Sequence, residues 1–154
     1  MWLKVRLPIG PNGTAGWIPR DRVRLARTRC FISIDLSRRT LVVYKRGRRL
    51  KRFKVVVGAP ATPTPRGRFA IYDRVKQGNP TGFTGPWVLP ITAHSRKIRK
   101  FDRGPGVVGK HGRDGASLAD PLGTARSHGC IRVNNSRIRY LAGFMKGTAV
   151  RIRR

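Results

Sequence analysis

The stretch Ser127-His128-Gly129-Cys130-Ile131-Arg132-Val133 carries more information about fold and chemistry than any other part of this sequence. A cysteine thiolate is a strong nucleophile, and a nearby imidazole creates it by accepting the thiol proton. Gly129 leaves the backbone beside Cys130 without a Cβ, so an acyl group can approach the sulfur closely. The stretch therefore predicts nucleophilic catalysis at Cys130, with the backbone N–H groups of Gly129 and Cys130 as candidates for stabilising an oxyanion.

Two histidines are candidates for the base that activates Cys130. His128 lies two residues before it, and on a strand the two side chains would share one face, with Cα atoms about 6–7 Å apart. His111, followed by Gly112, comes from a separate segment and can be aimed at the sulfur independently. We therefore favour His111 as the base and place His128 on the substrate or oxyanion side.

Less specific interpretations stand beside these assignments. A buried cysteine is most often a small hydrophobic residue, and this is how we interpret Cys30. A His-x-Cys pair with another histidine can bind zinc, but a fourth ligand such as His94 would be needed and the spacing fits no common zinc pattern. We expect no metal. Arg132, two residues past Cys130 on the same strand face, either holds a substrate carboxylate or is one of many surface arginines.

Strand patterns dominate the chain after residue 28. Residues rich in β-branched and aromatic side chains alternate with polar ones, which is typical of half-buried strands. Three prolines exclude a helix or a central strand from residues 58–67. The expected strands are 31–36, 40–45, 50–57, 68–72 and 148–152, with weaker patterns at 88–92 and 106–109. The sequence thus predicts a mainly β fold.

One convincing helix is expected after Asn134-Asn135-Ser136, because Asn is a good N-cap residue. We place its end at Gly147. Residues 77–87 and 113–127 are expected to be irregular loops, and the second is long enough to suggest a function. Four apolar residues fall on one face of the helix: Ile138, Leu141, Phe144 and Met145.

Positive charge dominates the composition, with 35 Lys and Arg against six acidic residues and a formal net charge of +29. All six acids are Asp, so motifs that require Glu are excluded: the HExxH metalloproteases, EF-hands and zinc deaminases. The charge predicts attraction to nucleic acid, an anionic membrane or an anionic cell-wall polymer. The basic residues alternate with apolar ones, which favours a solvated surface over a disordered basic arm.

The chain divides at its change of pattern. Residues 1–27 contain alternating apolar residues around an Asn12-Gly13 turn signal, and predict a β extension or the remnant of a small upstream β-module. Residues 28–154 form the main domain. No stretch approaches the ~20 apolar residues of a membrane span, and no signal peptide is visible. Cys30 and Cys130 allow one disulfide at most.

In combination, these motifs resemble the catalytic domain of bacterial L,D-transpeptidases, the cysteine enzymes that cross-link peptidoglycan. The family motif is His-Gly, then a loop, then Ser/Thr-His-Gly-Cys, an apolar residue and Arg or Asn, which residues 111–112 and 127–132 match. Residues 31–44 resemble the opening hairpin of the family, 58–69 its Gly…Thr-Pro-x-Gly-x-Phe segment, and 147–152 its last strand. The resemblance covers residues 28–154.

The resemblance implies a mixed β-sheet sandwich or barrel-like fold with one or two short helices, and a mechanism without a cofactor. Cys130 would attack the diaminopimelate carbonyl of a donor tetrapeptide, with His111 as base and the backbone carbonyl of Gly112 orienting its ring. An acceptor amine would resolve the thioester into a 3→3 cross-link. Ser127, His128 and Arg132 would contact substrate, and carbapenems would acylate Cys130. The enzyme would be a monomer in the periplasm or cell wall.

Two other functions stay open. An L,D-carboxypeptidase or hydrolase would use water in place of the acceptor amine on the same scaffold. A basic polyanion-binding module would have no need of an intact pair of His111 and Cys130. Lys110 stands where the family usually has an apolar residue, and we expect it to raise the positive potential and favour the thiolate.

Overall fold

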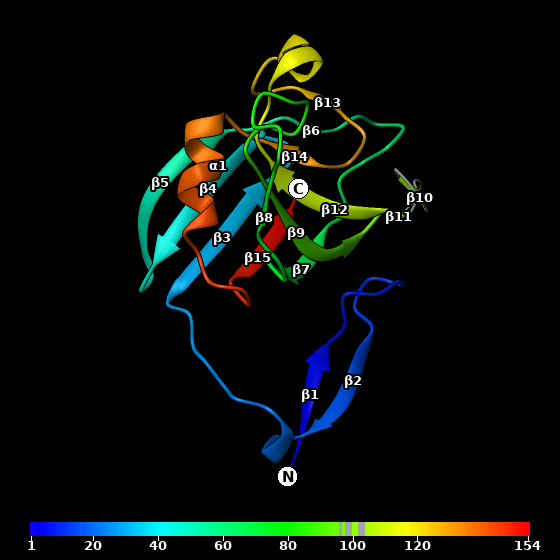
Figure 1. Ribbon diagram of the computed structural model, residues 1–154, viewed down its shortest axis with the longest axis vertical. Coiled ribbons are helices and arrows are strands. Elements are labelled where there is room, and N and C mark those ends of the chain that lie inside the picture. Colours follow the sequence, from blue (N-terminus) through cyan, green and yellow to red (C-terminus); the bar gives the residue numbers. More distant parts are fainter. Residues whose placement is uncertain (96, 98–99, 102–103) are drawn as a thin grey trace.

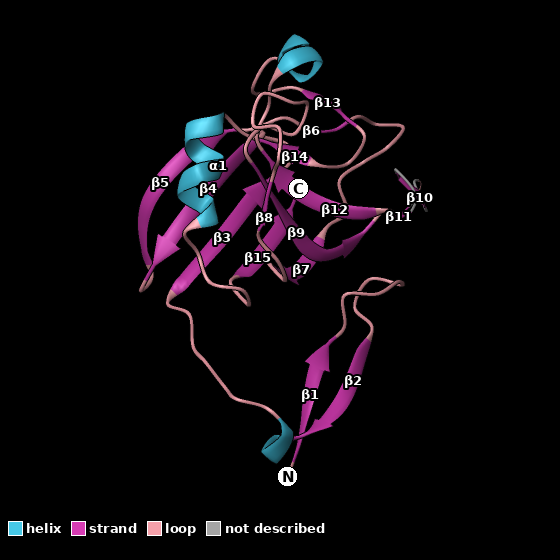
Figure 2. Cartoon of the chain, in the orientation of Figure 1, coloured by secondary structure: helices cyan, strands magenta, loops and turns pink. Residues whose placement is uncertain are grey.

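Two β-sheets and one helix enclose the hydrophobic core of the main body (Figures 1 and 2). The computed structural model describes residues 1–95, 97, 100–101 and 104–154. The larger sheet has the strand order β5-β4-β3-β15-β7, and the smaller has the order β14-β12-β9-β8. Among the described residues, no helix has the length and apolar character needed to span a membrane. The expectation of a mainly β fold with few short helices is confirmed.

The five-stranded sheet follows the strongest sequence patterns. Its strands are β3 (Cys30–Asp35), β4 (Thr40–Lys45), β5 (Arg48–Lys54), β7 (Gly67–Ala70) and β15 (Ala149–Arg153). β15 lies parallel to β3 and antiparallel to β7, so the last strand occupies the interior of the sheet. The inner face is apolar, with Ile32, Ile34, Leu41 and Val43 fully buried. β5 ends earlier than predicted, and the chain continues through buried residues 55–57.

The four-stranded sheet positions the catalytic motif. It contains β8 (Val75–Lys76), β9 (Trp87–His94), β12 (Val107–His111) and β14 (Ile131–Arg132). β12 runs antiparallel to β9 and parallel to β14. The two weak strand patterns thus belong to β9 and β12. Pro90 lies opposite Gly109 at an irregular step in their register, and both residues weaken the strand pattern in the sequence.

Short elements complete the main body. β6 (Val57–Gly58) pairs with β13 (Ala125–Ser127), and β10 (Lys100–Phe101) pairs with β11 (Gly104–Pro105). A 3-10 helix, Gly115–Ala119, lies within the segment that we expected to be an irregular loop. β13 occupies the end of the same segment, so 113–127 is more regular than predicted.

The helix α1 (Asn135–Ala142) begins within the stretch Asn134–Ser136 that was predicted to precede it, and it ends early. Ile138 and Leu141 are fully buried, and the ring of Tyr140 meets the ring of Phe53 edge-on at 6.2 Å between centroids. The predicted end at Gly147 is wrong, because the helix stops at Ala142 and Gly143 forms its C-cap. Gly147, with φ +85°, instead forms the turn into β15, where its N–H donates to the carbonyl of Ile71 at 2.7 Å. A hydrogen bond to Ile71, a residue distant in the sequence, thus decides the position of Gly147.

The N-terminal segment forms a hairpin of β1 (Trp2–Arg6) and β2 (Ala15–Pro19), followed by a short 3-10 helix, Arg20–Arg22. Figure 1 shows it extending from the main body on an open connecting segment. The side-chain amide of Asn12 donates to the carbonyl of His94 at 2.8 Å and accepts from its N–H at 2.7 Å. The hairpin turn is therefore fixed to the end of β9. The division at residue 28 stays a prediction.

Candidate active site

Cys130 lies in a tight connection between β13 and β14. Gly129 has φ +112°, a backbone conformation that favours glycine, and this turns the chain between the two strands. His128 and Cys130 therefore do not share a strand face, and neither do Cys130 and Arg132, because β14 begins only at Ile131. Both expectations of a shared face are wrong, since the glycine that opens the backbone also ends the strand.

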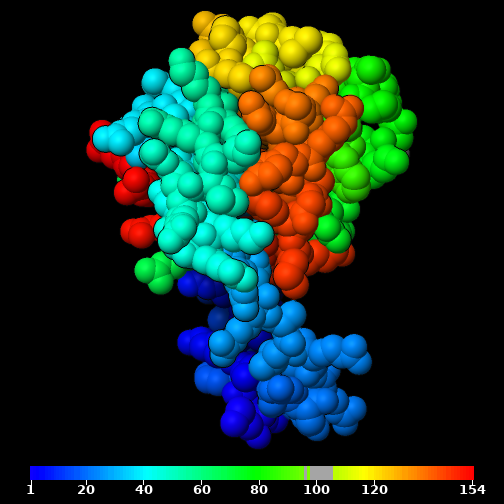
Figure 3. Space-filling view, turned by 90° about the vertical axis from the view of Figure 1, so that its left-hand side faces the viewer, coloured from blue at the N-terminus to red at the C-terminus, as the bar shows by residue number. Residues whose placement is uncertain are grey.

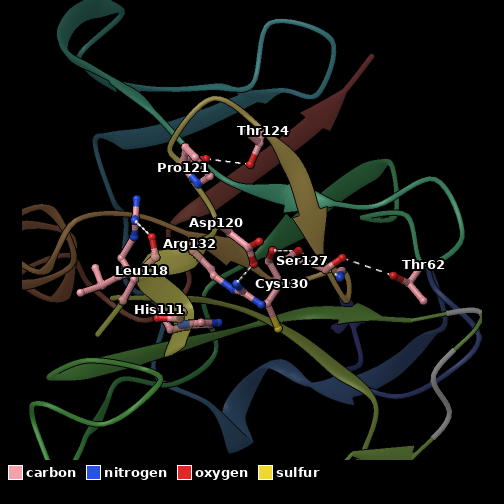
Figure 4. A network of polar contacts seen from close by, with 12 residues as sticks. Thr62, His111, Leu118, Asp120, Pro121, Thr124, Ser127, Cys130 and Arg132 are labelled. Atoms are coloured by element: carbon pink, nitrogen blue, oxygen red, sulfur yellow. Dashed lines mark hydrogen bonds and ion pairs between the residues drawn. The ribbon is translucent and has the colours of Figure 1, made fainter. Parts of the chain in front are cut away.

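Ser127 holds this turn and is fully buried. Its hydroxyl donates to the carbonyl of Cys130 at 2.5 Å and accepts from the N–H of Gly129 at 3.1 Å (Figure 4). Two predictions need correction as a result. Ser127 positions the turn and has no exposed surface for substrate, and the N–H of Gly129 is already bonded. The N–H of Cys130 is the remaining candidate of the predicted pair for stabilising an oxyanion.

Two threonines from the proline-rich segment support the same turn. The hydroxyl of Thr62 donates to the carbonyl of Ser127 at 3.2 Å, and that of Thr64 donates to the carbonyl of Gly129 at 2.8 Å. Thr64 also accepts the N–H of Gly58 at 2.9 Å, and is almost completely buried. The three prolines excluded a helix or a central strand from 58–67, but the sequence gave these threonines no role, because the signal lies in contacts between segments far apart in the chain.

His111 ends β12, and its ring orientation is fixed by the next residue. The distance from its Nδ1 to the carbonyl oxygen of Gly112 is 2.6 Å, so Nδ1–H donates there and Nε2 keeps its lone pair. A Cβ on Gly112 would collide with the side-chain oxygen of Asn135 and crowd Ile138 of α1. The glycine therefore lets the start of α1 pack directly against the backbone that orients the imidazole.

His111 and Cys130 line one pocket of about 240 Å³ together with His128 and Arg132. The parallel pairing of β12 with β14 brings them together, because it sets Lys110 opposite Ile131 and His111 opposite Arg132. In Figure 4 the ring of His111 and the sulfur of Cys130 lie on the same side of Arg132. The other walls are mainly apolar, and include Tyr72, Phe83, Val88, Pro90, Val107 and Val108.

Burial sets the resting protonation of the pair. It lowers the pKa of His111 to about 4, assisted by the charge of Arg132 and opposed by the bond to Gly112. Burial also raises the pKa of Cys130, and a backbone hydrogen bond from Gly109 and the charge of Arg132 only partly offset this. At neutral pH the site therefore holds a neutral thiol beside a neutral imidazole.

Lys110 does not act as predicted. It is fully buried, and burial lowers its pKa to about 7. Neighbouring residues of a strand point to opposite faces, so Lys110 faces away from the pocket that His111 lines. The expectation that Lys110 favours the thiolate is wrong, and Arg132 is the cation that lowers the pKa of Cys130.

Arg132 is almost completely buried at the pocket wall. Its guanidinium forms an ion pair with Asp120 at 2.6 Å, and lies 4.8 Å from the ring centroid of Phe83. The ring of Phe83 lies 6.0 Å from that of His111. Nε of Arg132 is buried and has no hydrogen-bond partner among the described residues.

Asp120, Phe83 and Gly109 are parts of this site that were not predicted from the sequence. Asp120 and Phe83 come from the two segments expected to be loops, and only the length of one and the aromatic residues of the other pointed to them. Exposed His128 lies on the pocket wall as predicted, whereas Cys30 does not line the pocket and both cysteines are free thiols. Within the described part of the chain, His, Cys and Asp side chains nowhere gather in threes that would hold a metal.

Comparison with known sequences gives the following matches. A family model described as the L,D-transpeptidase catalytic domain, YkuD, matches residues 30–152. The chain is 35% identical over 122 residues to a protein of Bacillus licheniformis named as the L,D-transpeptidase YkuD, covering 79% of this chain and 64% of that protein. The protein of the same name from Bacillus subtilis is 31% identical over 124 residues, with coverage of 80% and 65%. The chain thus spans slightly less than two thirds of these curated relatives.

Solved structures show the same fold. The Ldtfm–avibactam carbamoyl enzyme has a TM-score of 0.62 and 26% identity, covering 83% of this chain and 50% of that one. An Enterococcus faecium L,D-transpeptidase variant has a TM-score of 0.60 and 26% identity, with coverage of 80% and 49%. L,D-transpeptidase 3 from Mycobacterium tuberculosis, with a faropenem-derived adduct, has a TM-score of 0.61 at 18% identity, with coverage of 82% and 60%. The last of these shows a likeness of fold alone.

Proposed function

The chain belongs to the L,D-transpeptidase catalytic domain family, and from this we propose that it forms 3→3 cross-links in peptidoglycan through a thioester at Cys130. One observation supports the proposal most strongly. The Nδ1–H of His111 is bound to the carbonyl of Gly112, which leaves Nε2 as a base in the pocket that Cys130 also lines. A backbone carbonyl here takes the place of the carboxylate found in many catalytic triads.

In the proposed reaction, the sulfur of Cys130 attacks the carbonyl carbon at the L-centre of the third residue of a donor tetrapeptide. Its proton passes to Nε2 of His111 as the S–C bond forms. The imidazolium then protonates the amide nitrogen, the C–N bond breaks, and D-Ala leaves. The amine of an acceptor stem attacks the thioester in the same way and restores the thiol.

Neutral partners suit this sequence of proton transfers. The imidazole is unprotonated at neutral pH, so it can accept the thiol proton during the attack. The carbonyl of Gly112 stabilises the imidazolium that results. The backbone N–H of Cys130 would stabilise the developing oxyanion. No carboxylate or metal ion is required in these steps.

His128 and Arg132 are the proposed substrate-binding residues. His128 is exposed on the pocket wall, and Arg132 also lines the pocket. Because Asp120 already neutralises its guanidinium, Arg132 would bind substrate by directional hydrogen bonds more than by free charge. We further propose that the protein works outside the cytoplasmic membrane, because peptidoglycan lies there. We also propose that it acts as a monomer.

A covalent probe tests the nucleophile. A related LD transpeptidase is known in complex with imipenem. Imipenem should add its mass to the wild-type protein and to Cys30→Ala, but not to Cys130→Ala. Because Cys30 is the other thiol in the chain, Cys30→Ala is the matched control. An adduct that persists in Cys130→Ala would exclude the proposed nucleophile.

Product analysis tests the reaction type. A stem tetrapeptide incubated with a second stem carrying a free amine should give a cross-linked dimer and free D-Ala. A tripeptide formed in place of the dimer, even at saturating acceptor, would identify the protein as an L,D-carboxypeptidase. This assay separates a transpeptidase from a carboxypeptidase, because both form the thioester and they differ only in whether an amine or water attacks it.

A further inference from the structure

The outer face of the five-stranded sheet carries a row of cations that the proposed reaction does not use. Its inner face packs on the core, so the alternate side chains of each strand point to solvent. In Figure 3 the red residues of β15 project at the left rim, on the side of the sheet away from α1. Five exposed arginines belong to this outer face: Arg49 and Arg52 from β5, Arg68 from β7, and Arg151 and Arg153 from β15.

Two half-buried aromatic residues lie at the centre of these arginines. The rings of Phe31 and Tyr44, opposite each other on β3 and β4, have centroids 5.8 Å apart. Beside them is a hollow of about 300 Å³ whose lining includes Phe31, Arg68 and Arg151. We call these seven residues, the five arginines and the two aromatics, the basic sheet face. It shares no lining residue with the pocket of Cys130.

The charges of the basic sheet face are poorly neutralised. Arg68 and Arg151 lie directly opposite each other on neighbouring strands, an arrangement of like charges that destabilises a sheet. Among the described residues, Arg153 alone of the five has an acidic partner, Asp35, at 3.7 Å. An anion that bound here would relieve the repulsion between Arg68 and Arg151.

The spacing of the arginines indicates a polymer. Neighbouring strands lie about 4.8 Å apart, so the step from β5 to β15, with β4 and β3 between them, is roughly 14 Å. A single phosphate or carboxylate would reach Arg52 and Arg151 together only if both side chains lay flat across β4 and β3. A chain of repeated anionic groups can reach both without this, and the flat central rings offer an apolar surface for the faces of sugar rings.

We propose that the basic sheet face binds an anionic polysaccharide, a linear glycan whose units carry phosphate or carboxylate groups. The choice of a glycan over nucleic acid rests on the proposed function, since a polymer of the same cell wall would hold the pocket near its stem-peptide substrate. The surface itself rests on the paired arginines, the two rings and the hollow beside Phe31.

Binding to defined polymers tests this proposal. Phosphorylated dextran, polygalacturonate, neutral dextran and a 30-mer of deoxythymidine are titrated against the full chain at several salt concentrations. We expect both anionic glycans to bind with an affinity that falls as salt rises, neutral dextran not to bind, and the oligonucleotide to bind more weakly than the glycans. The relative affinity of the two anionic glycans identifies phosphate or carboxylate as the preferred group.

A matched pair of double variants separates a site from net charge. Arg68→Gln/Arg151→Gln and the control Arg24→Gln/Arg27→Gln each reduce the net charge from +29 to +27, and all four arginines are exposed. We expect about a tenfold loss of glycan affinity in the first variant and less than a twofold loss in the control. Equal losses would overturn the proposal, because net charge alone would then explain the binding. An oligonucleotide that bound more tightly than the glycans through the same two arginines would also overturn it.

The outcomes for this surface and for the proposed reaction are independent. Imipenem should acylate Cys130 at the same rate in Arg68→Gln/Arg151→Gln as in the wild type, and this also shows that the variant folds. Loss of the glycan preference with acylation intact would refute the surface alone. Loss of acylation in the wild type with the glycan preference intact would refute the reaction alone.

Discussion

Lys110 offers the most quantitative test of how this core is built. Its side chain is fully buried, and its amine has no hydrogen-bond partner among the described residues. Burial lowers its pKa from 10.5 to about 7. A charged amine in the folded core loses its hydration, and this free-energy cost is absent in the unfolded chain.

The sign of the pH dependence follows from the lowered pKa. Between pH 7 and 10.5 the folded state binds fewer protons at Lys110 than the unfolded state, so the free energy of unfolding rises with pH. The contribution is at most about 1.4 kcal/mol per pH unit and vanishes below pH 7, where the lysine is charged in both states. Over the whole window it amounts to roughly 5 kcal/mol.

Lys110→Met keeps the length of the side chain and removes the charge. At pH 7 we expect it to raise the free energy of unfolding by on the order of 4 kcal/mol, and the gain should shrink steadily as the pH approaches 10.5. Urea unfolding at five pH values from 6 to 10 gives the difference between variant and wild type, in which groups common to both cancel. Lys54→Met, at an exposed position on β5, is the control and should change stability little at any pH.

A pH-independent difference between Lys110→Met and the wild type would refute this reasoning. So would an equal gain in Lys54→Met, because the effect would then come from net charge and not from burial.

Three other predictions concern the active site. Asp120→Asn leaves the buried charge of Arg132 without its partner. We expect kcat/KM for a tetrapeptide to fall about 10- to 100-fold, and the free energy of unfolding measured in urea to fall by about 3 kcal/mol. Unchanged kinetics would contradict this role of Asp120. Gly112→Ala forces a Cβ into the start of α1 and should cost about 1–3 kcal/mol, with slower acylation; a neutral effect would show that the backbone adjusts freely. Because the pKa of His111 is lowered to about 4, the rate at which imipenem acylates Cys130 should stay constant from pH 8 down to about pH 5 and fall only below that. A fall in this rate with its midpoint near pH 6.5 would contradict the burial argument.

The parts of the fold that the sequence predicted well are those whose pattern is local. β3 and β4 are rich in β-branched and aromatic residues and are joined by a short turn, so their own side chains define them. β9 and β12 were only weak expectations because Pro90 and Gly109 interrupt them, although they pair along much of their length. The end of α1 was misplaced because a contact with Ile71, distant in the sequence, decides where Gly147 lies.

The same distinction holds for the candidate site. Cys130, His111 and the carbonyl of Gly112 follow from two short motifs, and the structure places them around one pocket. Asp120 and Thr64 could not be found in this way, because each is defined by a partner from another segment. The sequence also could not predict that the pKa of the Cys130 thiol is raised, because this shift depends on burial.

The place of β15 has a consequence for the order of events on the ribosome. It is synthesised after every other described strand, yet it lies inside the sheet, between β3 and β7. A nascent chain that lacks residues 149–153 can therefore form the meander of β3, β4 and β5 but cannot join it to β7. Because such distant pairings form slowly, the domain should complete its folding only after β15 has emerged from the ribosome.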